Sequence, residues 1–204
     1  TTFVSCFGYI AFARMVSGMG TTIFAAHSIA ITAEQIVYIP GYGLRVATST
    51  LVGNALGEKD IRKLKATERV SILITLLIMV VNGIGLYLFA YPFMRLFTNS
   101  VNAARIGSEM LRLVSFSEPF FGLMIVLEGI SYGMGRTKHV FACEAVSMWG
   151  IRIFGTFLCV NVFGLGLKAV WLCMIADNIC KAILLYIFRP KHVEENADDR
   201  GELR

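Results

Sequence analysis

The stretch TIFAAHSIAITAEQIVYIPGYGLRVATSTLVGNALG, residues 22–57, decides how the chain folds. It is mostly apolar and longer than the about 20 residues that a helix needs to cross a bilayer. Glu34 and Arg45 nevertheless lie inside it, and charged residues at membrane depth usually face a bundle interior or a water-filled path. Pro40 and Gly41 stand between them, and a proline removes one backbone hydrogen bond and bends a helix. The stretch predicts a bent, polar-lined membrane helix, which is typical of transporters.

The composition of the whole chain indicates a membrane protein. Of its 204 residues, 56% are hydrophobic and only 16% are charged, and the mean hydropathy is +0.66. Ordinary soluble domains carry about 25% charged residues. The net charge of +5 does not predict a nucleic-acid partner, because the basic residues lie in short loops between apolar spans. The five cysteines form no Cys-x-x-Cys pair and have no histidine at metal-ligand spacing, so we expect no metal site.

The apolar segments predict six membrane-spanning helices. They cover residues 1–17, 22–56, 70–94, 109–132, 140–162 and 169–188, and a hydrophilic tail covers 191–204. The chain opens inside an apolar segment, without an initiating methionine or a charged leader. We therefore expect it to be a piece of a longer protein.

Lysine and arginine residues are distributed unequally between the two sets of loops. One side holds nine of them: Lys59, Arg62, Lys63, Lys65, Arg69, Arg136, Lys138, Arg189 and Lys191. The other side holds three: Arg95, Arg105 and Lys168. Cytoplasmic loops carry the excess of basic residues, so we expect the connector 58–69 and the C-terminus in the cytoplasm.

Five stretches carry a family resemblance in their shared order and spacing. They are AAHSIAITAEQIVYIPGYGLRVATSTLVGNALGEKD (25–60), YPFMRLFTNS (91–100), FSEPFFGLMIVLEGISYGMGRTK (116–138), MWGIRI (148–153) and GLKAVWLCMIADNICKAILLYIFR (166–189). Together they cover nearly the whole chain apart from the tail, and they resemble the C-terminal half of multidrug and toxic compound extrusion (MATE) transporters.

The resemblance implies both a fold and a function. It implies twelve helices in two six-helix lobes around a central cavity. This chain would be the second lobe, an all-α six-helix bundle, and would work with the missing N-terminal lobe. Such proteins are not enzymes. They lie in the lipid bilayer of the cell (plasma) membrane and export organic cations or amphipathic drugs. The export is driven by Na⁺ or H⁺, and no other cofactor is implied.

Two positions depart from the family pattern. Several members carry a carboxylate early in the seventh helix, where this chain has Thr1, Thr2 and Ser5. Others carry one in the tenth helix at the position of Phe121, and here Glu118 lies one turn earlier. The resemblance therefore leaves the identity of the coupling ion open.

Glu34 is the principal candidate for a cation site. One helical turn is 3.6 residues, so His27, Tyr38 and Arg45 fall near the same face as Glu34. A carboxylate beside a cavity can attract Na⁺ or an organic cation, and a proton can compete with either. The alternative is that Glu34 only hydrogen-bonds a neighbouring helix.

Two further candidates lie in the fourth predicted span. Glu118 is either a cavity carboxylate or a cap for the helix segment that restarts at Pro119, where negative charge is favoured. Phe121, together with Tyr38, can line a cavity that binds flat cations by stacking and cation–π attraction, although ordinary packing is the alternative.

Three other charged residues are assigned to structural roles. Glu128 is expected to pair with Arg136 or Lys138, which follow it in the adjacent loop. Asp177 and Lys181 are four residues apart in the last span and are expected to form an ion pair within one helix.

Two other functions stay open on the sequence. A lipid-linked precursor flippase of related architecture would line its cavity with many more basic residues, to hold a pyrophosphate. A membrane scaffold without transport would leave the buried carboxylates without a role, at a cost of about 2.5 to 3.5 kcal/mol each. No Walker-type phosphate loop and no nucleophile-and-base motif occur, which disfavours an ATP-driven pump and an enzyme.

Overall fold

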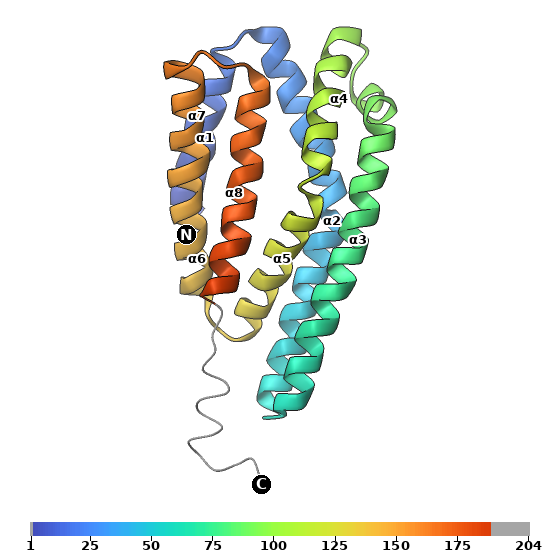
Figure 1. Ribbon diagram of the computed structural model, residues 1–204, viewed down its shortest axis with the longest axis vertical. Helices are drawn as coiled ribbons and strands as arrows, with labels where there is room; N and C mark the ends of the chain where they lie inside the picture. The colour runs from blue at the N-terminus through green and yellow to red at the C-terminus, as the bar shows by residue number, and fades with distance from the viewer. Residues whose placement is uncertain (1, 189–204) are drawn as a thin grey trace.

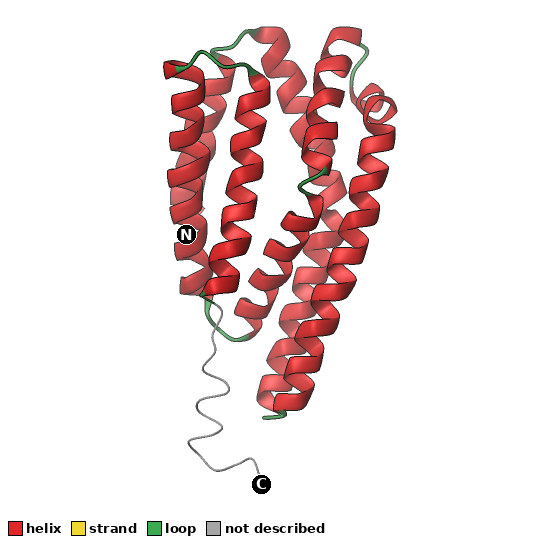
Figure 2. Ribbon diagram, in the orientation of Figure 1, coloured by secondary structure: helices red, strands yellow, loops and turns green. Residues whose placement is uncertain are grey.

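The computed structural model describes residues 2–188, and side chains from residue 7 onward, as helices joined by short loops (Figure 2). The elements are α1 (Thr2–Ser17), α2 (Thr21–Gly57), α3 (Ile61–Phe97), α4 (Val101–Ser115), α5 (Glu118–Gly133), α6 (Thr137–Ser147), the π-helix η1 (Met148–Ile153), α7 (Phe154–Phe157), the π-helix η2 (Leu158–Val162) and α8 (Leu167–Ile187). Thr1, the basic residues Arg189 and Lys191, and the tail 191–204 lie outside the described residues, as do the side chains of Thr2 and Ser5.

Several of these helices can cross a membrane. Four helical segments are long and apolar enough to span a bilayer: α2, α3, α8 and the continuous run Thr137–Val162. The bent pair α4–α5 makes a fifth span if the two helices count as one. The helix α1 has 16 residues. At 1.5 Å per residue it covers about 24 Å, which is less than the about 30 Å of bilayer hydrocarbon. The fold is all-helical, and the helices run side by side along the long axis (Figure 1).

The fourth predicted span differs from the structure. The sequence predicts one helix over 109–132, whereas α4 and α5 are separate helices that meet at a bend of 60°. Pro119 lies in the first turn of α5 and has no N–H to continue the ladder, and Ser117 Oγ donates back to the last turn of α4 at 2.8 Å. A Cβ atom on Gly83 would lie 2.8 Å from the Ser115 carbonyl oxygen, so α3 passes directly beside the bend.

The charged connector is largely helical. The prediction places a loop at 58–69, but α3 begins at Ile61, because Asp60 accepts a hydrogen bond from the Lys63 backbone N–H at 2.9 Å and caps the helix. The turn between α2 and α3 lies at the same end of the molecule as the turn between α5 and α6 (Figure 1). The connections α1–α2, α3–α4 and η2–α8 lie at the opposite end.

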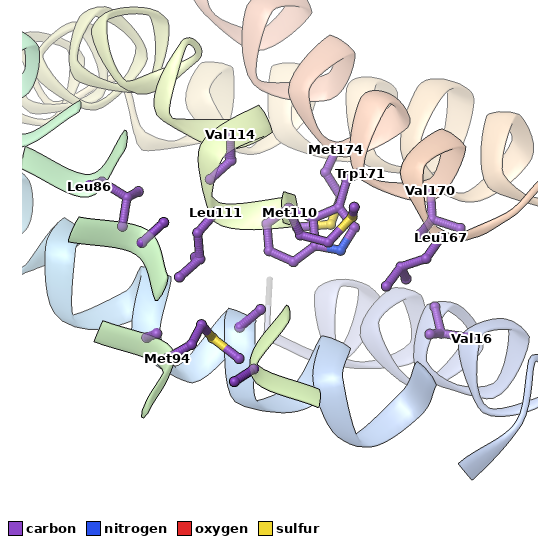
Figure 3. Packing of buried hydrophobic residues seen from close by; sticks show 14 of the residues in the cluster. Val16, Leu86, Met94, Met110, Leu111, Val114, Leu167, Val170, Trp171 and Met174 are labelled. Atoms are coloured by element: carbon purple, nitrogen blue, oxygen red, sulfur yellow. The ribbon is translucent and has the colours of Figure 1, made fainter. Parts of the chain in front are cut away.

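A hydrophobic cluster joins α1 and α8 to α2, α3 and α4 (Figure 3). Trp171 of α8 is fully buried in it and packs with residues of α4 such as Met110 and Leu111. Val16 of α1 and Met94 of α3 extend the cluster. This packing ties α8 to the helices that precede the bend.

The backbones of α2 and α5 are in close contact because α5 carries glycine where the two helices meet. A Cβ atom would lie 2.7 Å from the Arg45 carbonyl oxygen if added to Gly129, and 2.6 Å from the Ser49 carbonyl oxygen if added to Gly133. Small residues let membrane helices approach in this way. The contact places the C-terminal part of α5 directly against the second half of α2.

Gly129→Ala is expected to lower the free energy of unfolding by about 1 to 3 kcal/mol, because the added methyl group forces α5 away from the α2 backbone. Gly43→Ala is the matched control, since nothing lies within 4 Å of a Cβ atom at Gly43. Thermal melting of the two variants in detergent measures the difference. Equal melting temperatures would contradict the prediction.

Candidate functional site

A cavity of about 280 Å³ is lined by residues of α1, α2, α5, α6, η1 and α8. Its charged lining comes from both halves of the chain: Glu34, Arg45, Glu128, Glu144, Arg152 and Lys181. Its aromatic lining is supplied by Tyr9, Phe12, Tyr38, Tyr42, Phe121 and Tyr132. The cavity thus combines ionic groups with ring faces, which suits amphipathic cations.

Glu34 and Tyr38 form the centre of the α2 wall. Glu34 is only 3% exposed, and the Tyr38 hydroxyl donates to Glu34 Oε1 at 2.5 Å. The two residues are one turn apart, so the shared face that the spacing predicts is confirmed. The Phe121 ring stacks on the Tyr38 ring with centroids 3.7 Å apart and an interplanar angle of 15°. Phe121 therefore fixes Tyr38, and Tyr38 in turn orients the Glu34 carboxylate.

Arg45 lines the same cavity but pairs with another carboxylate. Its Nη1 donates to Glu128 Oε2 at 2.9 Å. The expectation that Glu128 pairs with Arg136 or Lys138 is wrong, because the close approach of α2 and α5 brings Arg45 to Glu128. The Arg45 guanidinium also lies 5.2 Å from the centre of the Tyr42 ring.

The two remaining candidates do not line the cavity. His27 is buried, and its Nδ1 accepts a hydrogen bond from Trp171 Nε1 at 3.2 Å. Glu118 is fully buried at the first residue of α5, the position that the capping alternative requires. Within residues 2–188, neither of its carboxylate oxygens has a hydrogen-bond partner. Glu118 therefore has the position of a capping residue but makes no cap hydrogen bond in the described part of the chain.

A second ionic cluster is centred on Asp177 of α8. Lys181 Nζ lies 3.0 Å from Asp177 Oδ2, so the ion pair predicted from the spacing is present. Ser147 Oγ donates to Asp177 Oδ1 at 2.5 Å, and Arg152 Nη1 lies 3.8 Å from Oδ2. Asp177 itself has no exposed side-chain surface. The cluster therefore joins α8 to α6 and to the π-helix η1.

Comparison with known proteins agrees with this architecture. The MatE family model matches residues 1–158 of the chain. The chain belongs to the MatE family. A probable multidrug resistance protein NorM of Thermotoga maritima is 30% identical over 188 residues, which are 91% of this chain and 40% of that protein. The multidrug resistance protein NorM of Aliivibrio fischeri is 26% identical over 141 residues, 69% of this chain and 31% of that protein. The chain thus spans two fifths or less of the length of these curated relatives.

Solved structures of MATE transporters share the fold. The eukaryotic MATE transporter AtDTX14 superimposes with a TM-score of 0.83 at 21% identity, over 97% of this chain and 46% of that one. A MOP superfamily transporter from Pyrococcus furiosus gives 0.84 at 19% identity, over 94% and 43%. The fold is consistent with one lobe of a MATE transporter, and members of this family are membrane transporters rather than enzymes.

Sequence reasoning missed part of the cavity lining. It did not single out Arg152 as a site residue, yet Arg152 lines the cavity. The signal available in the sequence was an arginine inside an apolar span whose neighbouring span carries Asp177 and Lys181. No pattern predicts the contribution of Ser147, because a serine in a membrane helix is common and its partner lies 30 residues away.

Proposed function

We propose that this chain is the C-terminal lobe of a secondary transporter that exports organic cations or amphipathic drugs, driven by Na⁺ or H⁺. The single observation that carries the proposal is which partners hold the Glu34 carboxylate. Within residues 2–188, the cavity carboxylate of Glu34 is held by a tyrosine hydroxyl and by no ion pair, whereas Glu128 and Asp177 are paired with basic residues. A carboxylate that is buried but not neutralised by the protein is suited to bind and release a cation.

The chemistry of the cavity supports organic cations as the substrate class. Aromatic faces attract cations by about 0.5 to 2 kcal/mol each, depending on desolvation. The stacked rings of Tyr38 and Phe121 lie next to Glu34, which supplies the opposite charge. The relatives named NorM are described as multidrug resistance proteins, and this agrees with a broad preference for amphipathic compounds.

The lipid-linked precursor flippase is less well supported. Its pyrophosphate would require an excess of basic groups in the cavity. Among the described lining residues, Arg45, Arg152 and Lys181 are balanced by as many acidic side chains. A scaffold without transport would not need an unneutralised carboxylate inside the bundle.

We place the chain in the plasma membrane with a second six-helix lobe beside it, and with the connector 58–69 and the C-terminus in the cytoplasm. This orientation predicts that a cysteine introduced at Lys63 is labelled only from the cytoplasmic side, and one at Asn102 only from outside. Membrane-impermeant maleimides applied to intact cells and to inverted vesicles make the measurement. External labelling at position 63 would reverse the orientation.

The function itself is tested by transport in a defined system. The full-length protein is reconstituted into liposomes with ethidium as substrate and without ATP. We expect ethidium movement that depends on an imposed Na⁺ or pH gradient, and whichever gradient drives it identifies the coupling ion. Ethidium movement that needs neither gradient would overturn the proposal.

A further inference from the structure

Arg152 is a buried cation with weak support from the protein. Its residue exposure is 9%, and it lies in the π-helix η1. In the described part of the chain, its guanidinium approaches a carboxylate at Asp177, where Nη1 lies 3.8 Å from Oδ2, beyond hydrogen-bond distance. Within residues 2–188, its Nε is buried without a hydrogen-bond partner. A buried charge held this loosely lowers the stability of the fold.

Asp177 does not depend on Arg152 for neutralisation. Lys181 Nζ lies closer, at 3.0 Å from the same carboxylate oxygen, and Ser147 Oγ donates to the other oxygen. Of the two basic side chains beside Asp177, Lys181 is therefore the closer partner, and Arg152 is the more loosely held.

The main contacts of the Arg152 guanidinium are aromatic. It lies 5.4 Å from the centre of the Phe12 ring and 5.8 Å from the centre of the Tyr9 ring, both on α1 and both in the cavity lining. Two ring faces and one distant carboxylate are the environment in which a cavity of this kind would hold an organic cation. Glu34 lines the same cavity as Arg152.

We propose that Arg152 is a tethered counter-cation, which competes with monovalent organic cations for the aromatic and acidic lining of the cavity. This inference rests on the proposed function and names a determinant of its substrate affinity. A cation that enters between Phe12, Tyr9 and Glu34 has to displace the guanidinium or accept its repulsion. The affinity of the wild-type protein is therefore held below the value that the rings and the carboxylate alone would give.

The backbone that carries Arg152 is irregular. Residues Met148–Ile153 and Leu158–Val162 are π-helical, and π-helical turns are frequent at functional sites. Gly150 lies in the first of these segments and has nothing within 4 Å of a Cβ position. Gly150 is exposed, so the outer face of the turn that carries Arg152 is unpacked.

The test is equilibrium binding of radiolabelled tetraphenylphosphonium to the full-length protein in detergent, at one pH. Arg152→Gln and Arg152→Met are each expected to lower the Kd about tenfold, because both remove the competing charge. Glutamine keeps a polar side chain at this position, whereas methionine does not. Arg152→Lys is expected to lower the Kd about threefold, since an ammonium group stacks less well on rings than a planar guanidinium. Lys168→Met is the matched control, because Lys168 is 71% exposed and paired with Glu109 outside the cavity.

The outcomes separate this inference from the proposed function. If Glu34→Gln abolishes binding but Arg152→Gln leaves the Kd unchanged, the proposed function stands and the counter-cation is overturned. If Arg152→Gln lowers the Kd and Glu34→Gln has no effect, the counter-cation stands and Glu34 loses its role. Should the Gln and Met variants fail to fold, the Lys variant decides, and a Kd equal to that of the wild type would overturn the inference. In the Gln variant, millimolar methylguanidinium should restore the competition.

Discussion

Glu34→Gln in the full-length protein is expected to fold and insert normally and to lose gradient-driven efflux by at least about tenfold. Glutamine has nearly the same shape as glutamate and can still accept the hydrogen bond from the Tyr38 hydroxyl. It cannot carry a negative charge, so a cation in the cavity loses its ionic partner. A loss of 1.4 kcal/mol is already tenfold in binding, and an ionic contact out of water exceeds that value.

The measurement is efflux of ethidium from cells or liposomes under an imposed Na⁺ or pH gradient. Glu109→Gln is the matched control, because Glu109 is half-exposed on α4 and pairs with Lys168 outside the cavity. This substitution also removes one carboxylate charge, but it leaves the cavity lining unchanged. If the Glu34 variant exports ethidium with the gradient dependence of this control, Glu34 has a structural role and does not act in transport.

The parts of the site that follow from the sequence are those within one helix. Glu34 and Tyr38 are four residues apart, as are Asp177 and Lys181, and helical geometry alone brings each pair together. The apolar segments predicted membrane helices for a similar reason, since hydrophobicity and segment length are local properties of the chain.

Contacts between helices did not follow from the sequence. Arg45 and Glu128 are 83 residues apart, and their contact depends on how deeply α5 packs into α2 at Gly129. The hydrogen bond from Trp171 to His27 spans 144 residues. Such pairs are set by helix packing, for which one sequence carries no direct signal.

The bend between α4 and α5 could be predicted from the sequence only in part. Pro119 was visible in the sequence as a point where a helix restarts, but the hydrophobic run across it predicted one continuous span. The structure separates the two helices because Ser117 closes α4 and Gly83 of α3 leaves room beside the break. Local signals therefore located the break, and packing decided its angle.

Asp177→Asn is expected to destabilise the folded protein strongly and to change substrate selectivity little. Asp177 has no exposed side-chain surface, and Lys181 is 9% exposed. Removal of the carboxylate charge leaves the buried Lys181 without its ion-pair partner. Breaking a buried ion pair costs about 3 to 5 kcal/mol, a large share of the about 5 to 15 kcal/mol that stabilises a typical protein. We expect low yields of folded protein in detergent.

Two variants separate this structural role from a direct role in transport. The double variant Asp177→Asn with Lys181→Met removes both charges and should recover part of the melting temperature, because no unpaired lysine remains. Lys168→Met breaks the exposed pair with Glu109 and should cost less than about 1 kcal/mol, since solvent screens that pair. Size-exclusion chromatography and thermal melting give the yields and stabilities. If Asp177→Asn instead accumulates at normal levels but no longer couples efflux to the gradient, Asp177 acts in transport and its structural assignment is wrong.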